Sequence, residues 1–181
     1  IVKIGTHEEV PRGVDGEICI NGPTVMLGYL NDVEETMQTL RTHEDGLLWL
    51  HTGDIGHMDE EGFVFFEQRL KRMIVSSGYN IYPSQIEDVL DKHEAVAFST
   101  VIGIPHPYKV EVAKAFIVLN PGFKPNNDTL KSIKEYCAKN ISKYALPYEY
   151  EFRDDLPKTL VGKVAYKELE EQEKNKKNKD K

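Results

Sequence analysis

The segment from Gln68 to Glu87 constrains the fold more than any other part of the chain, because strand, turn and helix signals follow one another within it. Met73-Ile74-Val75 favours a short strand. Ser76-Ser77-Gly78 ends that strand, since glycine accepts backbone angles and close ligand approach that other residues resist. Pro83 suits the first turn of a helix, and apolar or aromatic positions follow at helical spacing (Ile86, Val89, Leu90 and His93). The segment therefore predicts a strand, a glycine turn and a helix over residues 83–93, which alone would also fit a purely structural corner.

This segment is a junction between two different sequence textures. Before it, short apolar runs alternate with turn residues, which predicts strands over 17–20, 47–50 and 63–66. Asn31 is expected to cap a short helix, with Glu34 completing a capping box. Residues 1–68 are therefore predicted to form a β-rich unit.

After the junction, longer strands alternate with amphipathic helices. Strands are predicted over 95–104, 112–119 and 148–152, and 156–163 is predicted to be a loop. Asn127 or Asp128 is expected to cap a helix that carries apolar positions at helical spacing (Leu130, Ile133, Cys137 and Ile141). The pattern indicates a small α+β unit over 73–170, followed by a disordered basic tail over 171–181.

Composition excludes several functions. The 181 residues are 40% hydrophobic and 29% charged, which is typical of a globular protein, and a net charge of −7 disfavours nucleic acid or an anionic membrane as partner. No apolar run approaches the roughly 18 residues of a membrane span. Two cysteines without partners at metal-ligand spacing fit a reducing cytoplasm. The histidines show no metal-ligand spacing either, and surface or turn positions are expected for four of them (His51, His57, His93 and His106).

Three polar residues could carry chemistry. Asp54 follows Gly53 at the end of an apolar strand, where a carboxylate can bind a vicinal diol such as ribose, or only its own backbone in a turn. Arg69 could bind ribose or phosphate, or form a surface ion pair. Lys163 stands beside Gly162 on a loop, where its ammonium could reach developing negative charge or do nothing catalytic. Taken singly, none of the three decides a function.

Taken in order, nine segments resemble the successive signatures of the adenylate-forming superfamily, which includes acyl-CoA synthetases and peptide-synthetase adenylation modules. They cover residues 12 to about 168, and their joint occurrence is more specific than any one motif. The segments are Gly16-Glu17-Ile18-Cys19-Ile20, Gly28-Tyr29-Leu30, His51-Thr52-Gly53-Asp54-Ile55, Asp59-Glu60-Glu61-Gly62-Phe63, Arg69-Leu70-Lys71, Ser77-Gly78-Tyr79-Asn80-Ile81, Pro83-Ser84-Gln85-Ile86-Glu87, Gly103-Ile104-Pro105 and Pro157-Lys158-Thr159 through Gly162-Lys163.

The resemblance implies a two-step reaction, in which a carboxylic acid and ATP give an acyl-adenylate and a thiol then displaces AMP. By position, Asp54 and Arg69 would hold the AMP ribose, and Lys163 would stabilise charge during adenylation. Lys71 would lie in a hinge over 69–72, about which the small domain rotates, and Ser77 and Gly78 would face the CoA pantetheine. The implied cofactors are ATP/AMP, CoA and Mg²⁺, with the Mg²⁺ ligands outside this chain.

The resemblance also implies what this sequence lacks. The chain starts at Ile1, and the family's phosphate loop and acyl pocket precede the matching segments, so it is expected to be the C-terminal piece of a ligase. That piece would comprise the last, distorted barrel-like β-rich subdomain of the large domain and the whole small domain, and it would be inactive without the N-terminal domain. Two alternatives stay open: an adenylation module that loads a carrier-protein phosphopantetheine, and a non-catalytic binding module on the same fold. The acid substrate is undetermined, although fatty acid metabolism is common in the family.

Overall fold

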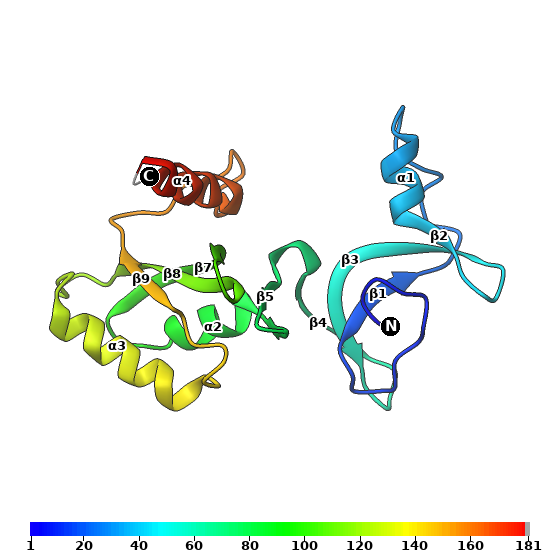
Figure 1. Ribbon diagram of the computed structural model, residues 1–181. Helices are drawn as coiled ribbons and strands as arrows, with labels where there is room; N and C mark the ends of the chain where they lie inside the picture. Colours follow the sequence, from blue (N-terminus) through cyan, green and yellow to red (C-terminus); the bar gives the residue numbers. More distant parts are fainter. Residues whose placement is uncertain (180–181) are drawn as a thin grey trace. The chain divides into compact units, whose positions relative to one another are not determined.

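The computed structural model describes residues 1–179, and its contacts divide the chain into two compact units, Ile1–Lys71 and Arg72–Lys181. The division falls inside the segment predicted to be a junction. Figure 1 shows the first unit in blue to teal and the second in green to red. None of the helices in residues 1–179 has the length and apolar character that a bilayer crossing requires.

The first unit is built on an antiparallel sheet of four strands: β1 (Gly16–Ile20), β2 (Leu40–Thr42), β3 (Leu48–Met58) and β4 (Val64–Arg69). The central strand β3 pairs with each of the other three, and it is strongly curved in Figure 1. One short helix, α1 (Val33–Thr39), precedes β2. The β-rich prediction is confirmed, and the predicted strand over 47–50 is only the first part of a longer one.

A glycine allows the close approach of β3 and β4. A Cβ atom added at Gly56 would lie 2.1 Å from the carbonyl oxygen of Phe65, a distance that backbone atoms cannot accommodate. The strand register also shifts between Ile55 and Gly56, so the sheet bends at this point. Asp54, on one side of the bend, pairs with Arg69 at the end of the β3–β4 pairing.

The first unit buries little of its own apolar surface. Its buried apolar residues include Val2, Leu40 and Ile55, whereas several large apolar side chains on α1, on β4 and in the segments just before them stay exposed (Leu27, Leu30, Val33, Met37, Phe63 and Phe66). Large apolar side chains left exposed in this way can mark places of contact with another protein segment.

The second unit contains a sheet of five strands: β5 (Ile74–Ser76), β6 (Tyr79–Ile81), β7 (Val96–His106), β8 (Val110–Leu119) and β9 (Glu149–Phe152). The order is β6-β5-β8-β7, and β9 joins β8 in parallel while the other pairs are antiparallel. Together with its helices this sheet makes the predicted α+β unit, so the predicted fold class is confirmed.

Helices cover both faces of this sheet. Helix α2 (Pro83–Leu90) and helix α3 (Asn127–Asn140) pack on one face, and helix α4 (Tyr166–Lys179) packs on the other, as Figure 1 shows. Alternate residues of β8 face opposite sides, as expected for a strand. Ala113, Ala115 and Ile117 join the core under α2 and α3, and Val112, Phe116 and Val118 join the core under α4.

The glycine turn of the junction is a hairpin turn, not a direct strand-to-helix corner. Strands β5 and β6 pair on either side of Ser77 and Gly78, which have φ angles of +51° and +84°. Positive φ at both central residues is typical of a type I′ hairpin turn, for which Gly at the second position is favoured. The sequence pattern missed β6 because three residues are too few to show alternation.

Two helix caps differ by one residue from the predicted positions: the cap of α1 lies one residue later, and the cap of α3 lies one residue earlier. Asp32 caps α1 by accepting a hydrogen bond from the Glu35 amide at 2.9 Å, whereas Asn31 adopts a left-handed φ of +59°. Asn126 caps α3 by accepting from the Thr129 amide at 2.9 Å, so neither Asn127 nor Asp128 is the cap. Adjacent Asn and Asp residues have nearly equal cap propensity, so the backbone decides between them.

The predicted disordered tail over 171–181 is wrong for residues 171–179, which belong to α4. The helix is fixed by Leu169, which is completely buried, and by Glu173, whose carboxylate lies 2.7 Å from the Lys114 ammonium. These contacts outweigh the weak amphipathicity of a lysine-rich sequence. Asp180 and Lys181 lie outside the described residues.

Candidate functional site

Asp54 and Arg69 form an ion pair at the end of the β3–β4 pairing. They are register partners, and Arg69 Nε lies 2.9 Å from Asp54 Oδ1, although this contact does not have hydrogen-bond geometry. About a quarter of the Asp54 side chain and 63% of the Arg69 side chain are exposed. Since exposed ion pairs contribute only about 0–1 kcal/mol, the pair is free to exchange its contact for a ligand.

The part of β3 that precedes Asp54 is held by a buried carboxylate. Glu17, 4% exposed, accepts from the Gly53 amide at 3.1 Å through Oε1 and contacts His51 Nδ1 at 2.9 Å through Oε2. Thr52 Oγ1 accepts from the Asp54 amide at 3.0 Å. Glu17 therefore positions the backbone that presents Asp54. Its only sequence signal is a glutamate inside an apolar strand.

Lys163 lies on a tight turn whose base is closed by backbone bonds. The Thr159 amide donates to the Lys163 carbonyl at 2.7 Å, and Lys158 and Val164 form an isolated antiparallel bridge. Gly162 has a φ of +79°, which favours glycine at this position. Lys163 is exposed, and its ammonium has no ion-pair partner among the described residues. The turn therefore presents a free cation to solvent.

Ser77 and Gly78 form the tip of the β5–β6 hairpin, beside the β7–β8 turn. The Ser77 amide donates to the Lys109 carbonyl at 3.0 Å. No heavy atom lies within 4 Å of a Cβ built on Gly78, so the turn conformation and not close packing requires glycine here. Val110, whose φ is +69°, is a β-branched residue in a strained conformation next to this turn.

The boundary between the two units separates an exposed lysine from an anchored arginine. Lys71 is exposed within the 3-10 helix η1 (Leu70–Arg72). Arg72 Nη2 donates to Glu87 at 2.6 Å, and its guanidinium lies 3.9 Å from the centre of the Tyr166 ring. Glu87 also accepts from the Val101 amide at 2.7 Å. Arg72, the first residue of the second unit, is therefore anchored within that unit.

Of the predicted site residues, only Asp54 and Arg69 are brought into contact. Both belong to the first unit, whereas Ser77, Gly78 and Lys163 belong to the second. Lys71 is the last residue of the first unit. The predicted joint action of Asp54, Arg69 and Lys163 therefore stays a prediction.

A charge network of the second unit joins β8, β9 and α4. Lys114, 6% exposed on β8, contacts carboxylates of Glu173, Glu151 and Glu149 at 2.7, 2.9 and 3.2 Å. Burial raises the pKa of Glu151, but hydrogen bonds from Lys114 and Lys176 and the charges of Lys114 and Arg153 outweigh it and lower that pKa to about 2. The same two lysines lower the pKa of Glu173 against the effect of burial. This network holds α4 on the sheet.

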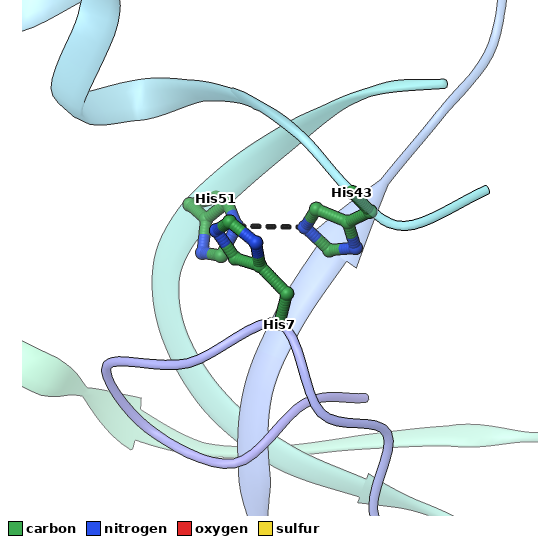
Figure 2. Close-up of side chains that lie close together, drawn as sticks. All are labelled: His7, His43 and His51. Carbon is green, nitrogen blue, oxygen red and sulfur yellow. Dashed lines mark hydrogen bonds between the residues drawn. The ribbon is translucent and has the colours of Figure 1, made fainter. Parts of the chain in front are cut away.

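Two histidines predicted to lie at the surface are buried. His51, 5% exposed, points toward His7 and His43, as Figure 2 shows, and its Nε2 lies 3.0 Å from His43 Nε2. His93, 7% exposed, accepts from the Ala95 amide and contacts Ser132 Oγ at 3.1 Å. Burial, followed by the neighbouring His7 and His51, lowers the pKa of His43. The sequence could not reveal the His7–His43–His51 cluster because its members are separated by 36 and then 8 positions.

The first unit carries a partly exposed carboxylate–guanidinium pair, and the second is a small α+β unit with a lysine turn. Comparison with protein families finds that residues 85–163 match the AMP-binding enzyme C-terminal domain. The chain belongs to the AMP-binding, adenylate-forming enzymes and corresponds to the C-terminal part of its members.

Similar proteins cover both units. The long-chain-fatty-acid–CoA ligase of Bacillus subtilis is 46% identical over 158 residues, which is 87% of this chain and 27% of that protein. A fatty acid–acyl-carrier-protein ligase of Streptomyces coeruleorubidus is 37% identical over 165 residues, or 91% of this chain and 30% of that protein. The crystal structure of ATP-bound MatB from Rhodopseudomonas palustris has 32% identity and a TM-score of 0.84, covering 95% of this chain and 33% of that one. The chain thus spans less than a third of the curated relatives it resembles.

Proposed function

We propose that this chain is the C-terminal part of an ATP-dependent acid–thiol ligase of the acyl-CoA synthetase type. In the first step, a carboxylate oxygen attacks the α-phosphorus of ATP, giving an acyl-adenylate and pyrophosphate. In the second, the thiol of CoA, losing its proton, attacks the acyl carbon, and AMP leaves. The observation that carries the proposal is the partly exposed Asp54–Arg69 pair in a chain of this family, because it offers a diol acceptor and a cation side by side.

Asp54 and Arg69 are proposed to bind the ribose of AMP. A carboxylate accepts hydrogen bonds from both hydroxyls of a vicinal diol, and a guanidinium donates in a fixed fork. The present contact between them lacks hydrogen-bond geometry, so a ribose would replace a weak interaction. Glu17, through the Gly53 amide, would keep the part of β3 around Asp54 in place during binding.

Lys163 is proposed to stabilise the negative charge that gathers between the acid oxygen and the α-phosphate during adenylation. An exposed ammonium without an ion-pair partner in the described chain has no internal contact to give up before it binds. Such a charge accelerates the reaction most when it acts in a site closed to water. Lysine, a compact point charge on a flexible stem, suits a group that must arrive and withdraw.

The two half-reactions are proposed to use different orientations of the second unit. Lys71 would lie in the hinge over 69–72, and the turn of Ser77 and Gly78 would line the path of the CoA pantetheine in the second step. The pantetheine is a thin chain, and the space around Gly78 is open. Domain rotation between steps is a known means of separating incompatible chemistry.

The proposal requires an upstream domain of the same protein, carrying the phosphate loop, the acyl pocket and the Mg²⁺ ligands. The apolar side chains that the first unit leaves exposed, among them Leu27, Leu30 and Phe63, support such a partner surface. The names of the relatives favour a long-chain fatty acid as the first acid to test. Two free cysteines fit a cytoplasmic location.

Half-reaction kinetics of the full-length protein test the proposal. Lys163→Ala should suppress adenylation, measured as acid-dependent pyrophosphate release, by several orders of magnitude. It should leave thiolysis of supplied acyl-adenylate largely intact. Lys158→Ala, on the same turn but ion-paired to Asp155 at 3.0 Å, is the matched control and should retain both steps. Equal loss of both steps in Lys163→Ala would contradict the assigned role.

The identity of the thiol separates CoA from a carrier protein. One relative is named as an acyl-carrier-protein ligase, which keeps phosphopantetheine on a carrier as the second candidate. Supplying acyl-adenylate with CoA or with a pantetheinylated carrier protein distinguishes the two acceptors. A protein that binds ATP but forms no adenylate with any acid would instead be a non-catalytic module.

A further inference from the structure

We propose that His7, His43 and His51 of the first unit form a binding site for a divalent transition-metal ion of the zinc class. Figure 2 shows the three rings converging from three different segments of the first unit. Nitrogen atoms of the three rings lie within 4.8 Å of one another. Imidazole nitrogen is a preferred ligand of Zn²⁺, Cu²⁺ and Ni²⁺.

His51 is already oriented as a metal ligand. Its Nδ1 lies 2.9 Å from Oε2 of Glu17, and both side chains are at most 5% exposed. A buried carboxylate that accepts from Nδ1–H fixes the tautomer and leaves the lone pair of Nε2 free to bind a cation. This carboxylate–histidine arrangement is the one that usually supports zinc-binding histidines.

His43 stands at nearly the right separation to share that cation. The Nε2 atoms of His43 and His51 are 3.0 Å apart, which fits one proton shared in a hydrogen bond. Two nitrogen ligands about 2.05 Å from a tetrahedral Zn²⁺ lie about 3.3 Å apart. The rings need to separate by only a few tenths of an ångström for a metal ion to take the place of the shared proton, which moves to His43 Nδ1.

His7 can supply the third nitrogen. It stacks on His43 with ring centres 4.6 Å apart, and its ring centre is 5.7 Å from that of His51. His7 is exposed and lies in the turn that the Val2–Glu9 bridge closes, so its ring can rotate toward the other two without disturbing the sheet.

The space beside the cluster leaves room for a further ligand. A cavity of about 650 Å³ is lined by His7 and His43 together with Cys19, Trp49 and the Ile1–Val2 segment. Three protein ligands with an open fourth position are typical of sites that keep a water or a small ligand on the metal.

Zinc titration of the full 181-residue chain, without an affinity tag, tests the site. Calorimetry should give one Zn²⁺ per chain, and the fluorescence of Trp49 should change over the same titration. Trp49 is the only tryptophan and stacks on His43 with ring centres 5.4 Å apart, so it reports events at this cluster. Co²⁺ should produce the visible absorption of a tetrahedral site with nitrogen ligands.

Substitutions show whether these histidines bind the ion. His7 is exposed and His43 is half-buried, so neither His7→Gln nor His43→Gln should prevent folding. Each substitution should weaken Zn²⁺ binding at least about tenfold, which is the smallest effect usual even for residues that only support a metal ligand. His57→Gln is the matched control, because His57 contacts Asp15 and Glu67 in a separate cluster of possible ligands. The proposal is overturned if Zn²⁺ does not bind saturably, if both variants bind like the original chain, or if His57→Gln abolishes binding.

Discussion

Removing the Lys114 ammonium should destabilise the second unit more than removing any exposed charge. Lys114 is 6% exposed on β8 and contacts three carboxylates, of which Glu173 on α4 is also buried. Lys114→Met keeps most of the aliphatic volume but leaves Glu173 without its nearest cation. The variant therefore isolates the electrostatic contribution to the docking of α4.

The size of the effect follows from the contacts that remain. Breaking a buried ion pair by removing one partner costs about 3–5 kcal/mol, because the other charge stays buried. Lys176 still contacts Glu173 at 2.8 Å and Glu151 at 3.0 Å in the variant, so the lower end applies. We expect the free energy of unfolding to fall by about 3 kcal/mol and the melting temperature by about 12 °C or more for a unit of this size.

Urea denaturation followed by circular dichroism measures the change. Lys176→Met is the matched control: it removes a lysine of the same network that is 49% exposed, and it should cost less than about 1 kcal/mol. Adding Glu173→Leu to Lys114→Met should restore much of the stability, because two apolar side chains then replace the pair. A loss below about 1 kcal/mol in Lys114→Met would refute the reasoning.

Two further predictions follow from the same unit. The pKa values of Glu151 and Glu173 are lowered in the folded state, so both carboxylates stabilise it at pH values above the ordinary pKa of 4.5. The urea midpoint should therefore fall as the pH drops from 4.5 towards 2, and it should fall less steeply in Lys114→Met. A constant midpoint would contradict the assigned pKa of Glu151. In the full-length protein, Gly78→Trp should slow thiolysis and spare adenylation. Gly122→Trp, at a φ of +99° with equally open surroundings, should spare both steps, and unchanged thioester formation in Gly78→Trp would remove the pantetheine role of this turn.

Local sequence signals predicted the elements that are specified by residues close to one another in the sequence. The apolar runs of β7 and β8 and the helical spacing of α2 and α3 are visible without a structure, because each element presents its own periodic face. The junction was also visible, since strand, Gly turn and Pro83 follow one another closely. Asp54 and Arg69 were identified singly, and their contact follows from the antiparallel register of β3 and β4.

Elements that depend on distant partners were missed. α4 has few apolar positions and looks like a solvated basic tail, yet the Lys114–Glu173 contact joins residues 59 positions apart. β6 is too short for its pattern to be recognised, and its existence depends on the turn of Ser77 and Gly78. His51 has the sequence surroundings of a turn residue and is buried against Glu17 from another strand.

The sequence by itself determined the division into a β-rich and an α+β unit, the family, and the residues proposed to bind ribose and assist adenylation. Local periodicity and the order of the motifs are enough to recognise these features. Only the tertiary structure decided which polar groups are buried and which meet. Strand register placed Arg69 beside Asp54, and chain segments far apart in the sequence brought His7, His43 and His51 together. Burial and pairing are properties of contacts between distant segments, and no single stretch of sequence contains them.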